Sequence, residues 1–411
     1  MCSILTRRFL PYALVLAALC FACSARLQGG WQKVGRPNVL FIALDDLNDW
    51  IKVLDPDAPI HTPHIERLAK RGTFFTKAYC ASAACNPSRT ATMTGLRPTT
   101  TGVYGNKANW RKALPKAVTL SQHFMAHGYR AEGAGKIFHH HYGGAFHDAA
   151  SFDDFLLMPD PPDAPMPQEK LNGLPKYGSP NTDWGPWPKN EADAVDVRTA
   201  NYVIKTLKKK HNRPFFLAAG IFRPHMPFFA PQRYFDIYPS DEVTMPKVFA
   251  KDLDDLPSGA ATLLKSKKWF FRELMETEVR SPGTWKEAVR AYQASASFAD
   301  EQVGRILHAL DNSDYADNTI IVLWSDHGYH LGEKEHWEKF ALWEKTNHVP
   351  LIIVAPGITR SGSRCERPVS LIDIYPTLID LCGLDAKPEL DGVSLVPLLK
   401  NPNAGWDRPA L

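Results

Sequence analysis

The sequence predicts an α/β fold in which a largely parallel β-sheet is covered by helices on both faces. Two observations lead to this prediction. Five short, almost wholly apolar runs read as buried strands, and segments that read as helices lie between them. Near-continuous apolar strands are typical of parallel sheets buried on both faces. Alternation of strands with helices is typical of α/β domains.

Each of these elements has a place along the chain. The expected strands are residues 39–44, 130–135, 214–221, 319–324 and 349–355. The expected helices are residues 119–127, which Gly128 ends, 197–209, 287–310 and 374–381. Residues 148–193 are rich in Pro, Asp, Gly and Trp and show no clear period. We expect this stretch to be a long surface excursion that forms a wall of a binding cleft.

The composition is that of an ordinary globular protein. The 411 residues are 44% hydrophobic and 22% charged, which is enough chain for one large domain or two smaller ones. The formal net charge of +4 is too small to indicate nucleic-acid binding, and Lys208–Lys210 form the only basic block of note. No repeat of fixed period is present.

The N-terminus has the layout of a secretory signal peptide. Arg7 and Arg8 precede an apolar run at residues 9–23, and small and polar residues follow. A membrane anchor is the alternative, but the run is short for a span and contains Pro11. We therefore assign residues 1–25 to a signal peptide. The expected protein is exported, periplasmic or secreted, or of lysosomal type in a eukaryote, without a transmembrane span in the mature chain.

Few cysteines remain once that segment is removed. Of seven cysteines, Cys80, Cys85, Cys365 and Cys382 belong to the mature chain. These four are too few for a disulfide scaffold at this length, and none of them forms a CxxC zinc motif. Cys365 and Cys382 either pair or are two buried thiols. Cys23 is a minority candidate for lipidation, which would make the protein lipid-anchored.

Polar side chains stand where several of the expected strands end. In open α/β sheets, ligands bind beyond the carboxyl ends of the strands. We therefore expect groups from distant parts of the chain to converge at one edge of the sheet. These groups are Asp45, Asp46, Lys136, His225, Asp326 and His327.

The carboxylates among them suggest a metal site. Asp45 and Asp46 are adjacent anions that repel each other unless a cation or solvent compensates. Alone, such a pair is better explained by a solvated turn or a helix N-cap. With Asp326 and His327 it supplies three oxygen ligands and one nitrogen ligand for a divalent cation. The oxygen ligands favour Ca²⁺, with Mg²⁺ as the alternative, and the histidine leaves room for a transition metal.

Four other polar residues are ambiguous by themselves. Lys136 and His139 lie in GKIFH, and His139 begins a run of three histidines that also fits a solvated loop. His225 lies between prolines, which fits a rigid turn, and Lys339 fits a surface charge.

The chain resembles the type I sulfatases. Residues 85–89, CNPSR, followed by TGLRP at residues 94–98, resemble the C-x-P-S-R motif of that family. The resemblance covers about residues 36–400. Further similar segments are residues 38–46, 61–72, 135–136, 325–328, 373–378 and 391–399.

A finer resemblance is to the iduronate-2-sulfatase-like branch of this family. Its marks are LRPTTTGVY at residues 96–104, GKIFH at 135–139, RPHMPF at 223–228 and LGEKEHWEKF at 331–340. The pair Asp326-His327, where many sulfatases have Asp-Asn, indicates the same branch.

The resemblance implies a fold, a modification and a set of roles. It implies the mixed, mostly parallel sheet of alkaline phosphatases and sulfatases. It also implies that a formylglycine-generating maturase oxidises Cys85 to Cα-formylglycine, whose hydrate attacks the sulfur of a sulfated saccharide such as iduronate 2-sulfate in a glycosaminoglycan. The implied metal ligands are Asp45, Asp46, the modified Cys85, Asp326 and His327. The other implied site residues are Arg89 and Lys136 at the formylglycine, His139 at its diol, and Lys136, His225 and Lys339 at the sulfate, with His225 as candidate acid.

The resemblance also bears on domain organisation and on rival functions. We expect a catalytic domain over residues 36–400 and the start of a truncated C-terminal region at 401–411, because family members usually continue into a small subdomain. One rival is a phosphate or phosphonate ester hydrolase of the same superfamily. The other is a non-catalytic protein that binds anionic glycans, although no residue of the motif is substituted.

Overall fold

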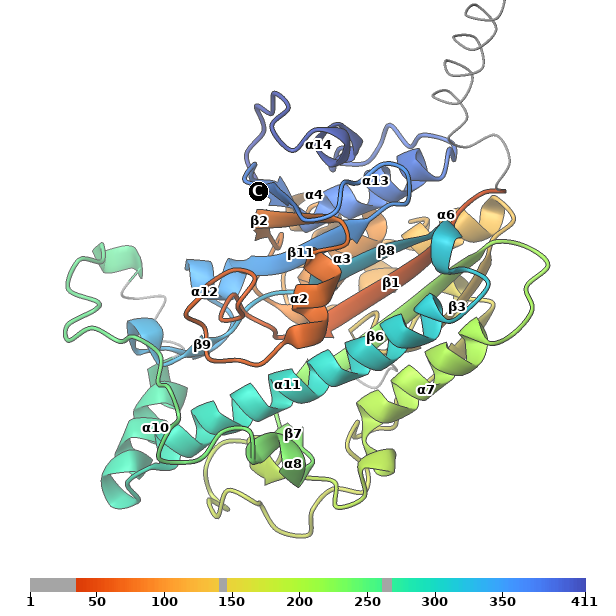
Figure 1. The fold of residues 1–411 in the computed structure, drawn as a ribbon. Helices are drawn as coiled ribbons and strands as arrows, with labels where there is room; N and C mark the ends of the chain where they lie inside the picture. Colours follow the sequence, from red (N-terminus) through yellow and green to blue (C-terminus); the bar gives the residue numbers. More distant parts are fainter. Residues whose placement is uncertain (1–34, 140–145, 261–267) are drawn as a thin grey trace, which may run out of the picture.

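A nine-stranded β-sheet with helices on both faces forms the centre of the protein (Figure 1). The structure is a computed structural model that describes residues 35–139, 146–260 and 268–411. The strand order is β12-β2-β11-β8-β1-β6-β3-β4, and β13 also pairs with β2. The predicted α/β fold is therefore confirmed.

All five expected strands are present. The strands of the main sheet are β1 (Asn38–Asp45), β2 (Thr73–Tyr79), β3 (Arg130–Gly135), β4 (Asp154–Leu156), β6 (Phe215–Pro224), β8 (Thr319–Ser325), β11 (His348–Val354), β12 (Ser363–Cys365) and β13 (Val369–Ser370). Two small sheets pair β5 (Trp184–Pro186) with β7 (Phe228–Ala230), and β9 (His330–Leu331) with β10 (Trp337–Glu338).

The main sheet is mixed and mostly parallel, as predicted. β1 pairs in parallel with β6 on one side and β8 on the other, and β3 pairs in parallel with β6. β11 is antiparallel to both β8 and β2. Because β3, β6, β1 and β8 run in one direction, their carboxyl ends meet at the same edge of the sheet.

Alternate side chains of β1 enter two separate hydrophobic cores. Leu40 and Ile42 pack in the core that includes side chains of the long helices on one face. Val39 and Phe41 pack in the core on the opposite face. Since successive strand side chains point to opposite faces, burial of both faces requires the uninterrupted apolar run seen in the sequence.

The helices form the two outer layers. They are α2 (Pro63–Ala69), α3 (Cys85–Thr94), α4 (Pro98–Thr101), α5 (Trp110–Ala113), α6 (Leu120–Ala126), α7 (Val195–Leu207), α8 (Gln232–Phe235), α10 (Lys268–Arg280), α11 (Thr284–Asp311), α12 (Glu344–Asn347), α13 (Ile374–Leu381) and α14 (Val396–Lys400). The helices α7 and α11 lie side by side along one face, and α13 and α14 lie over the other (Figure 1).

The four expected helices correspond to α6, α7, α11 and α13. In α6, the side chain of Thr119 accepts from the backbone of Gln122 while Gln122 reaches back, so a capping box starts the helix. Gly128, at φ 85°, follows the end of α6 as expected.

Residues 148–193 are more ordered than the sequence analysis expected. β4 extends the main sheet beside β3, and β5 pairs with β7. Tyr177 and Trp184 are buried in the core that includes α7 and α11. The expectation of a surface excursion is therefore wrong for these parts, because strands of three residues are too short to show a period.

Three further expectations concern the cysteines, a membrane span and the N-terminus. Cys365 and Cys382 are buried free thiols, so the second alternative for this pair holds. Within the described ranges, no helix is long and apolar enough to cross a membrane. The predicted signal peptide and Cys23 lie outside the described residues.

Candidate active site

The polar residues expected at the strand ends lie together at the carboxyl edge of the sheet. Asp45 is the last residue of β1, Lys136 follows β3, and Asp326 follows β8. Two overlapping groups of side chains converge here. Within each group, every residue offers one possible ligand atom, and these atoms all lie within 4.8 Å of one another. The groups are Asp45, Asp46, Cys85 and His225, and Asp45, Cys85, Asp326 and His327.

Asp46 turns the chain at the end of β1. Its φ of 66° lies in the left-handed region, which Asp enters more readily than most residues. Its backbone N–H donates to Asp326 Oδ1 at 3.2 Å, which fixes the turn against the end of β8. Neighbouring strand side chains would point to opposite faces, so this turn is what allows Asp45 and Asp46 to serve one site.

Helix α3 brings Cys85 and Arg89 into the same site. Cys85 is the first residue of α3, and Arg89 lies four positions later on the same side of the helix. Every residue of α3 is buried, and Gly95 ends it at φ 69°. The hydroxyl of Ser88 donates to the backbone oxygen of Asp326 at 2.5 Å. Cys85 and Arg89 of the CxPSR motif are thus about one helical turn apart, and Ser88 holds this turn against the residue that follows β8.

Buried cations neutralise the buried carboxylates. Three ion pairs, each between a basic side chain and a carboxylate, lie in the site, and all six of their side chains are less than one-tenth exposed. Buried charges are tolerated only when they are paired, since removal of either partner leaves an uncompensated charge. The pairs are Lys136 with Asp45, Arg89 Nε with Asp326 Oδ2 at 2.8 Å, and Lys339 Nζ with both oxygens of Asp46 at 2.8 Å.

These charges change the acidity of the group at position 85. Burial by itself raises the pKa of the Cys85 thiol, but Lys136, Lys339 and His327 together lower that pKa well below its usual range. His327 Nε2 lies 3.3 Å from Cys85 Sγ. The N-terminus of α3 also favours negative charge there. The site therefore stabilises an anionic atom at position 85.

The carboxylates next to it differ in acidity. Burial opposes ionisation of Asp45, yet Lys136 brings its pKa below the usual value. Burial raises the pKa of Asp326 to about 6, although Arg89 acts in the opposite direction.

The residues at the strand ends fit a hard divalent cation. Both carboxylate oxygens of Asp45 are buried, and the contacts made to them are ion pairs, with Lys136 at Oδ2 and with Arg89 Nη2 at 3.5 Å from Oδ1. His327 Nε2 lies 3.3 Å from Asp46 Oδ1 and 3.6 Å from Asp326 Oδ2. His327 Nδ1 donates to the Gly328 carbonyl at 2.9 Å, which leaves Nε2 as the ligand nitrogen. Three carboxylates and one imidazole are a donor set suited to Ca²⁺ or Mg²⁺.

Two histidines complete the group around position 85. His139 makes a side-chain hydrogen bond with Cys85, and the two histidines that follow it lie outside the described residues. His225 is half-buried; its Nδ1 donates to the Met226 carbonyl at 2.5 Å, and its ring centroid lies 4.7 Å from that of Phe222. The structure thus gathers every residue that the sequence analysis proposed, while their chemical roles stay predictions.

Sequence reasoning missed the residues that hold this site in place. The Asn86 amide donates to the backbone oxygens of Gly105 and Ala108 at 3.0 and 2.8 Å and fastens a loop beside the motif. The Tyr292 hydroxyl donates to the Asp46 carbonyl at 2.8 Å. A signal existed only for Asn86, which lies inside the quoted motif.

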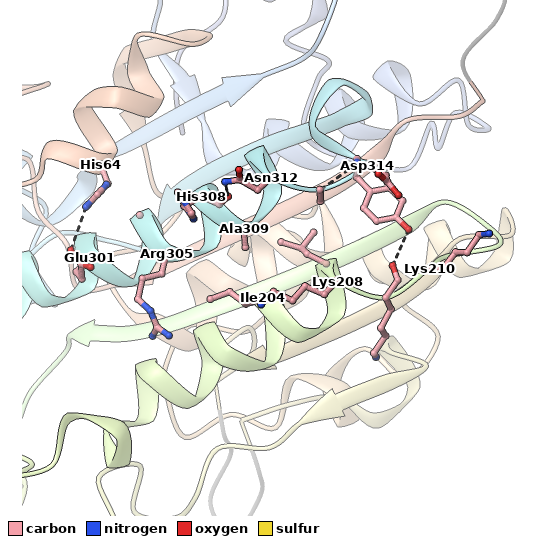
Figure 2. Close-up of a pocket in the computed structure, with 15 residues that line it drawn as sticks. His64, Ile204, Lys208, Lys210, Glu301, Arg305, His308, Ala309, Asn312 and Asp314 are labelled. Carbon is pink, nitrogen blue, oxygen red and sulfur yellow. Dashed lines mark hydrogen bonds and ion pairs between the residues drawn. The ribbon is translucent and has the colours of Figure 1, made fainter.

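A groove of about 840 Å³ lies elsewhere, between α7 and α11 (Figure 2). Figure 2 shows Lys208 and Lys210 on one side and His308 on the other, with His64 close to Glu301. α7 leads into β6 and α11 leads toward β8, so the groove lies by the amino ends of these strands. The lysines follow the C-terminus of α7, where the helix dipole favours cations. This groove contains none of the predicted site residues.

The fold and the site define a class of hydrolase. A mixed α/β sheet of the alkaline phosphatase and sulfatase type carries at its carboxyl edge a buried cysteine at a helix N-terminus, a cluster of carboxylates and imidazoles, and a set of basic side chains. The sequence model of the sulfatase family matches residues 37–384, and the chain belongs to this family.

Curated relatives agree on sulfate-ester chemistry and differ in substrate. A sulfatase of Formosa agariphila is 38% identical over 406 residues, which cover 95% of this chain and 78% of that protein. Iduronate 2-sulfatase of Homo sapiens is 30% identical, covering 93% and 75%, and choline-sulfatase of Rhizobium meliloti is 31% identical, covering 89% and 72%. The relatives support a sulfatase and leave its substrate open.

A solved structure shows the same fold. The phosphonate monoester hydrolase of Agrobacterium radiobacter aligns with a TM-score of 0.70 at 22% identity, covering 90% of this chain and 79% of that chain. At this identity the likeness concerns the fold alone.

Proposed function

We propose that this protein is an exported sulfuric ester hydrolase that removes sulfate from a sulfated saccharide, after a maturase has oxidised Cys85 to Cα-formylglycine. The position of Cys85 carries the proposal. Cys85 begins the buried helix α3, within 4.8 Å of ligand atoms from carboxylates and from an imidazole. Membership of the sulfatase family supports this reading of the motif.

The candidate cofactors have defined places. Asp45, Asp46, Asp326 and His327 would hold the divalent cation, with the modified residue 85 beside them. The cation would supply Lewis-acid polarisation, and the hydrated aldehyde would supply the attacking hydroxyl and a second hydroxyl whose deprotonation releases sulfate.

The basic side chains of the chain act on the charge of the sulfate group. Sulfuryl transfer shifts negative charge toward the leaving oxygen, and preorganised cations stabilise that shift without reorganising. Lys136 and Lys339 both act electrostatically on position 85. Arg89 fixes the edge of this pocket, because its guanidinium donates to Asp326 and to the backbone oxygen of Lys136.

Two histidines handle protons in this proposal. His225 Nδ1 is engaged with the Met226 carbonyl, so Nε2 is the nitrogen that passes a proton to the leaving oxygen. His139, which makes a hydrogen bond to the atom at position 85, assists at the diol of the modified residue.

The substrate class rests on motifs instead of overall identity. Identity to iduronate 2-sulfatase of Homo sapiens is 30% and to choline-sulfatase of Rhizobium meliloti 31%, so identity does not choose between a saccharide and a small alcohol. The segments GKIFH at residues 135–139 and RPHMPF at 223–228 favour a saccharide such as iduronate 2-sulfate.

The test of this proposal measures both the chemical state of residue 85 and the preference between a sulfate ester and a phosphate ester. Protein co-expressed with a maturase should show an aldehyde at position 85 by peptide mass analysis, and it should hydrolyse the sulfate ester of an aryl alcohol in preference to its phosphate ester. Cys85→Ala should be inactive. Activity in protein that carries only the thiol would contradict the mechanism.

Two other outcomes of the same test would each support one of the alternative functions. Preference for the phosphate ester would indicate a phosphate or phosphonate ester hydrolase. Binding of sulfated saccharides without turnover, in protein that carries the aldehyde, would indicate a non-catalytic glycan-binding protein. Defined sulfated saccharides would then identify the sugar.

A further inference from the structure

A buried ion pair ties the segment 148–193 to the loop that carries His225. Arg223 is the penultimate residue of β6, and its Nη2 pairs with Asp163 Oδ1. The side chains are 3% and 5% exposed, so the pair is shielded from solvent. A buried guanidinium needs such a partner, and Asp163 is the carboxylate that contacts its side chain.

The same guanidinium holds the backbone around His225. Arg223 Nε donates to the Phe229 carbonyl at 2.8 Å, and Nη1 lies 3.4 Å from the His225 carbonyl. One side chain therefore bridges the start and the end of the turn that displays His225. Its planar fork of donors can make these contacts together with the carboxylate contact.

The start of this turn is also fixed from α7. Asp196, in the first turn of α7, accepts the backbone N–H groups of Phe222 and Arg223 at 2.6 and 3.0 Å. The end of β6 is therefore anchored independently of Asp163. Loss of Asp163 should loosen the side of the turn that follows Arg223 and leave the strand in place.

The ring of Phe222 transmits this arrangement to the imidazole. Its centroid lies 4.7 Å from that of His225 and 5.1 Å from Arg223 Cζ. Lys136 Nζ lies 5.2 Å from the same ring. The imidazole is thus placed by packing against a ring that also contacts the anchored guanidinium.

We infer that Asp163 is a positioning residue for His225 and acts through Arg223. The inference rests on the proposed function, in which His225 protonates the leaving oxygen. Asp163 touches no reacting atom in this scheme. By holding Arg223 it keeps His225 Nε2 where an alkoxide leaving group needs a proton. The segment 148–193 thereby affects catalysis by contact with this turn.

The first measurement compares two leaving groups. A sugar alkoxide needs a proton as the S–O bond breaks, whereas an activated phenolate leaves with little help. Misplacement of a catalytic group by about 1 Å costs about 100-fold, so Asp163→Asn should lower kcat/KM for a sugar sulfate by about 10- to 100-fold. The aryl sulfate should lose less than about threefold. Equal losses for both substrates would overturn the inference.

A double-mutant cycle separates positioning from general damage. If Asp163 acts through His225, then Asp163→Asn in a His225→Ala background should cause no further loss with the sugar sulfate. Two losses that simply multiply would contradict the inference. The formylglycine content of each variant is measured, so that rates refer to mature enzyme.

Further variants keep the test decisive. Arg223→Lys retains the charge but not the fork, and it should reproduce the loss specific to the sugar sulfate even where Asp163→Asn folds poorly. Asp163→Glu should recover part of the activity. Asp148→Asn is the matched control, because Asp148 pairs with Arg111 at 2.7 Å near the start of the same segment. It should leave the ratio of the two substrates unchanged.

The outcomes also separate this inference from the proposed function. If His225→Ala shows the leaving-group dependence and both variants of the buried pair do not, the inference fails and the proposed function stands. If the wild-type protein with an aldehyde at position 85 hydrolyses neither sulfate ester, the proposed function itself fails.

Discussion

Asp46 shows how single residues of this site combine structural and chemical work. Its left-handed turn aims the carboxylate into the site, and Lys339 Nζ donates to both of its oxygens at 2.8 Å. The oxygen atoms that would bind a cation are therefore held before any cation arrives. Substitution by Ala would leave Lys339 buried without this partner, so Asn is the more informative replacement.

We predict that the enzyme needs an oxygen-preferring divalent cation and that Asp46→Asn weakens its binding. Loss of a group that merely orients a metal ligand costs about 10- to 100-fold, so loss of this ligand should lower kcat/KM by at least about 100-fold. Ca²⁺ should raise the unfolding temperature of the wild-type protein, because a ligand that binds only the folded state stabilises it. The variant should show little of this increase.

The control for this prediction is metal removal from the wild-type protein. Exhaustive chelation should abolish turnover, and Ca²⁺ or Mg²⁺ should restore it. Full turnover by protein that is free of metal by elemental analysis would count decisively against the proposed site.

Among the elements, β3 and β6 approach each other so closely that two glycines are required. Gly135, at the end of β3, has φ 78°, and a Cβ there would lie 2.0 Å from the backbone oxygen of Gly220 in β6. A Cβ on Gly220 would in turn lie 2.3 Å from the backbone of Lys136. This contact sets the position of Lys136, whose N–H donates to the Gly220 carbonyl at 2.9 Å.

We predict that Gly135→Ala destabilises the fold by roughly 2–5 kcal/mol, because backbone strain and overpacking act together. Gly128→Ala is the control, since its φ is 85° but nothing lies within 4 Å of the added Cβ. It should cost only the left-handed strain, about 1–2 kcal/mol. Denaturant unfolding measures both values. Similar losses in the two variants would show that the β3 and β6 backbones can separate freely.

The burial and length of a strand decide whether it can be predicted from the sequence. β1 and β8 are buried on both faces along their whole length, and each contains a continuous apolar run, VLFIAL in β1 and IIVLW in β8. β2 is not expected from the sequence, because the second half of TFFTKAY interrupts the apolar pattern with the half-buried Thr76 and the exposed Lys77. β4 has three residues, and only its pairing with β3 defines it as a strand.

The site could be predicted only as far as local patterns reach. Asp45, Cys85 and Asp326 stand at strand or helix ends within recognisable segments. The supporting contacts leave no such mark, because Asp163 and Arg223 are 60 residues apart and Asp46 and Tyr292 are 246 apart. Contacts across such separations depend on the folded arrangement.

For the whole molecule, Asp300 connects the helices on one face of the sheet. It lies in α11, and its two carboxylate oxygens accept the backbone N–H groups of His64 and Ile65 at 3.0 and 2.8 Å. These donors belong to the first turn of α2, where N–H groups have no partner within the helix. One buried carboxylate thus docks α2 onto α11.

This contact predicts a pH dependence of global stability. Burial raises the pKa of Asp300 to about 7, although the two N–H groups act in the opposite direction and Glu301 adds to the increase. The pKa of an Asp in the unfolded chain is about 3.9. Between about pH 4 and pH 7 the folded state therefore holds a proton that the unfolded state has lost, so stability falls as pH rises through this window.

Comparison with Asp300→Asn isolates this effect, because Asn cannot titrate and the other groups cancel. From pH 4 to pH 8 the free energy of unfolding of the wild-type protein should fall relative to the variant, by up to roughly 4 kcal/mol. Urea unfolding at several pH values measures the difference. Parallel curves for the two proteins would show that Asp300 is ionised in the folded state at pH 5, so that the N–H groups of α2 outweigh the cost of burial. A falling difference would show instead that Asp300 is protonated in the folded protein in mildly acidic solution, so that the cost of burying its charge outweighs the hydrogen bonds from α2.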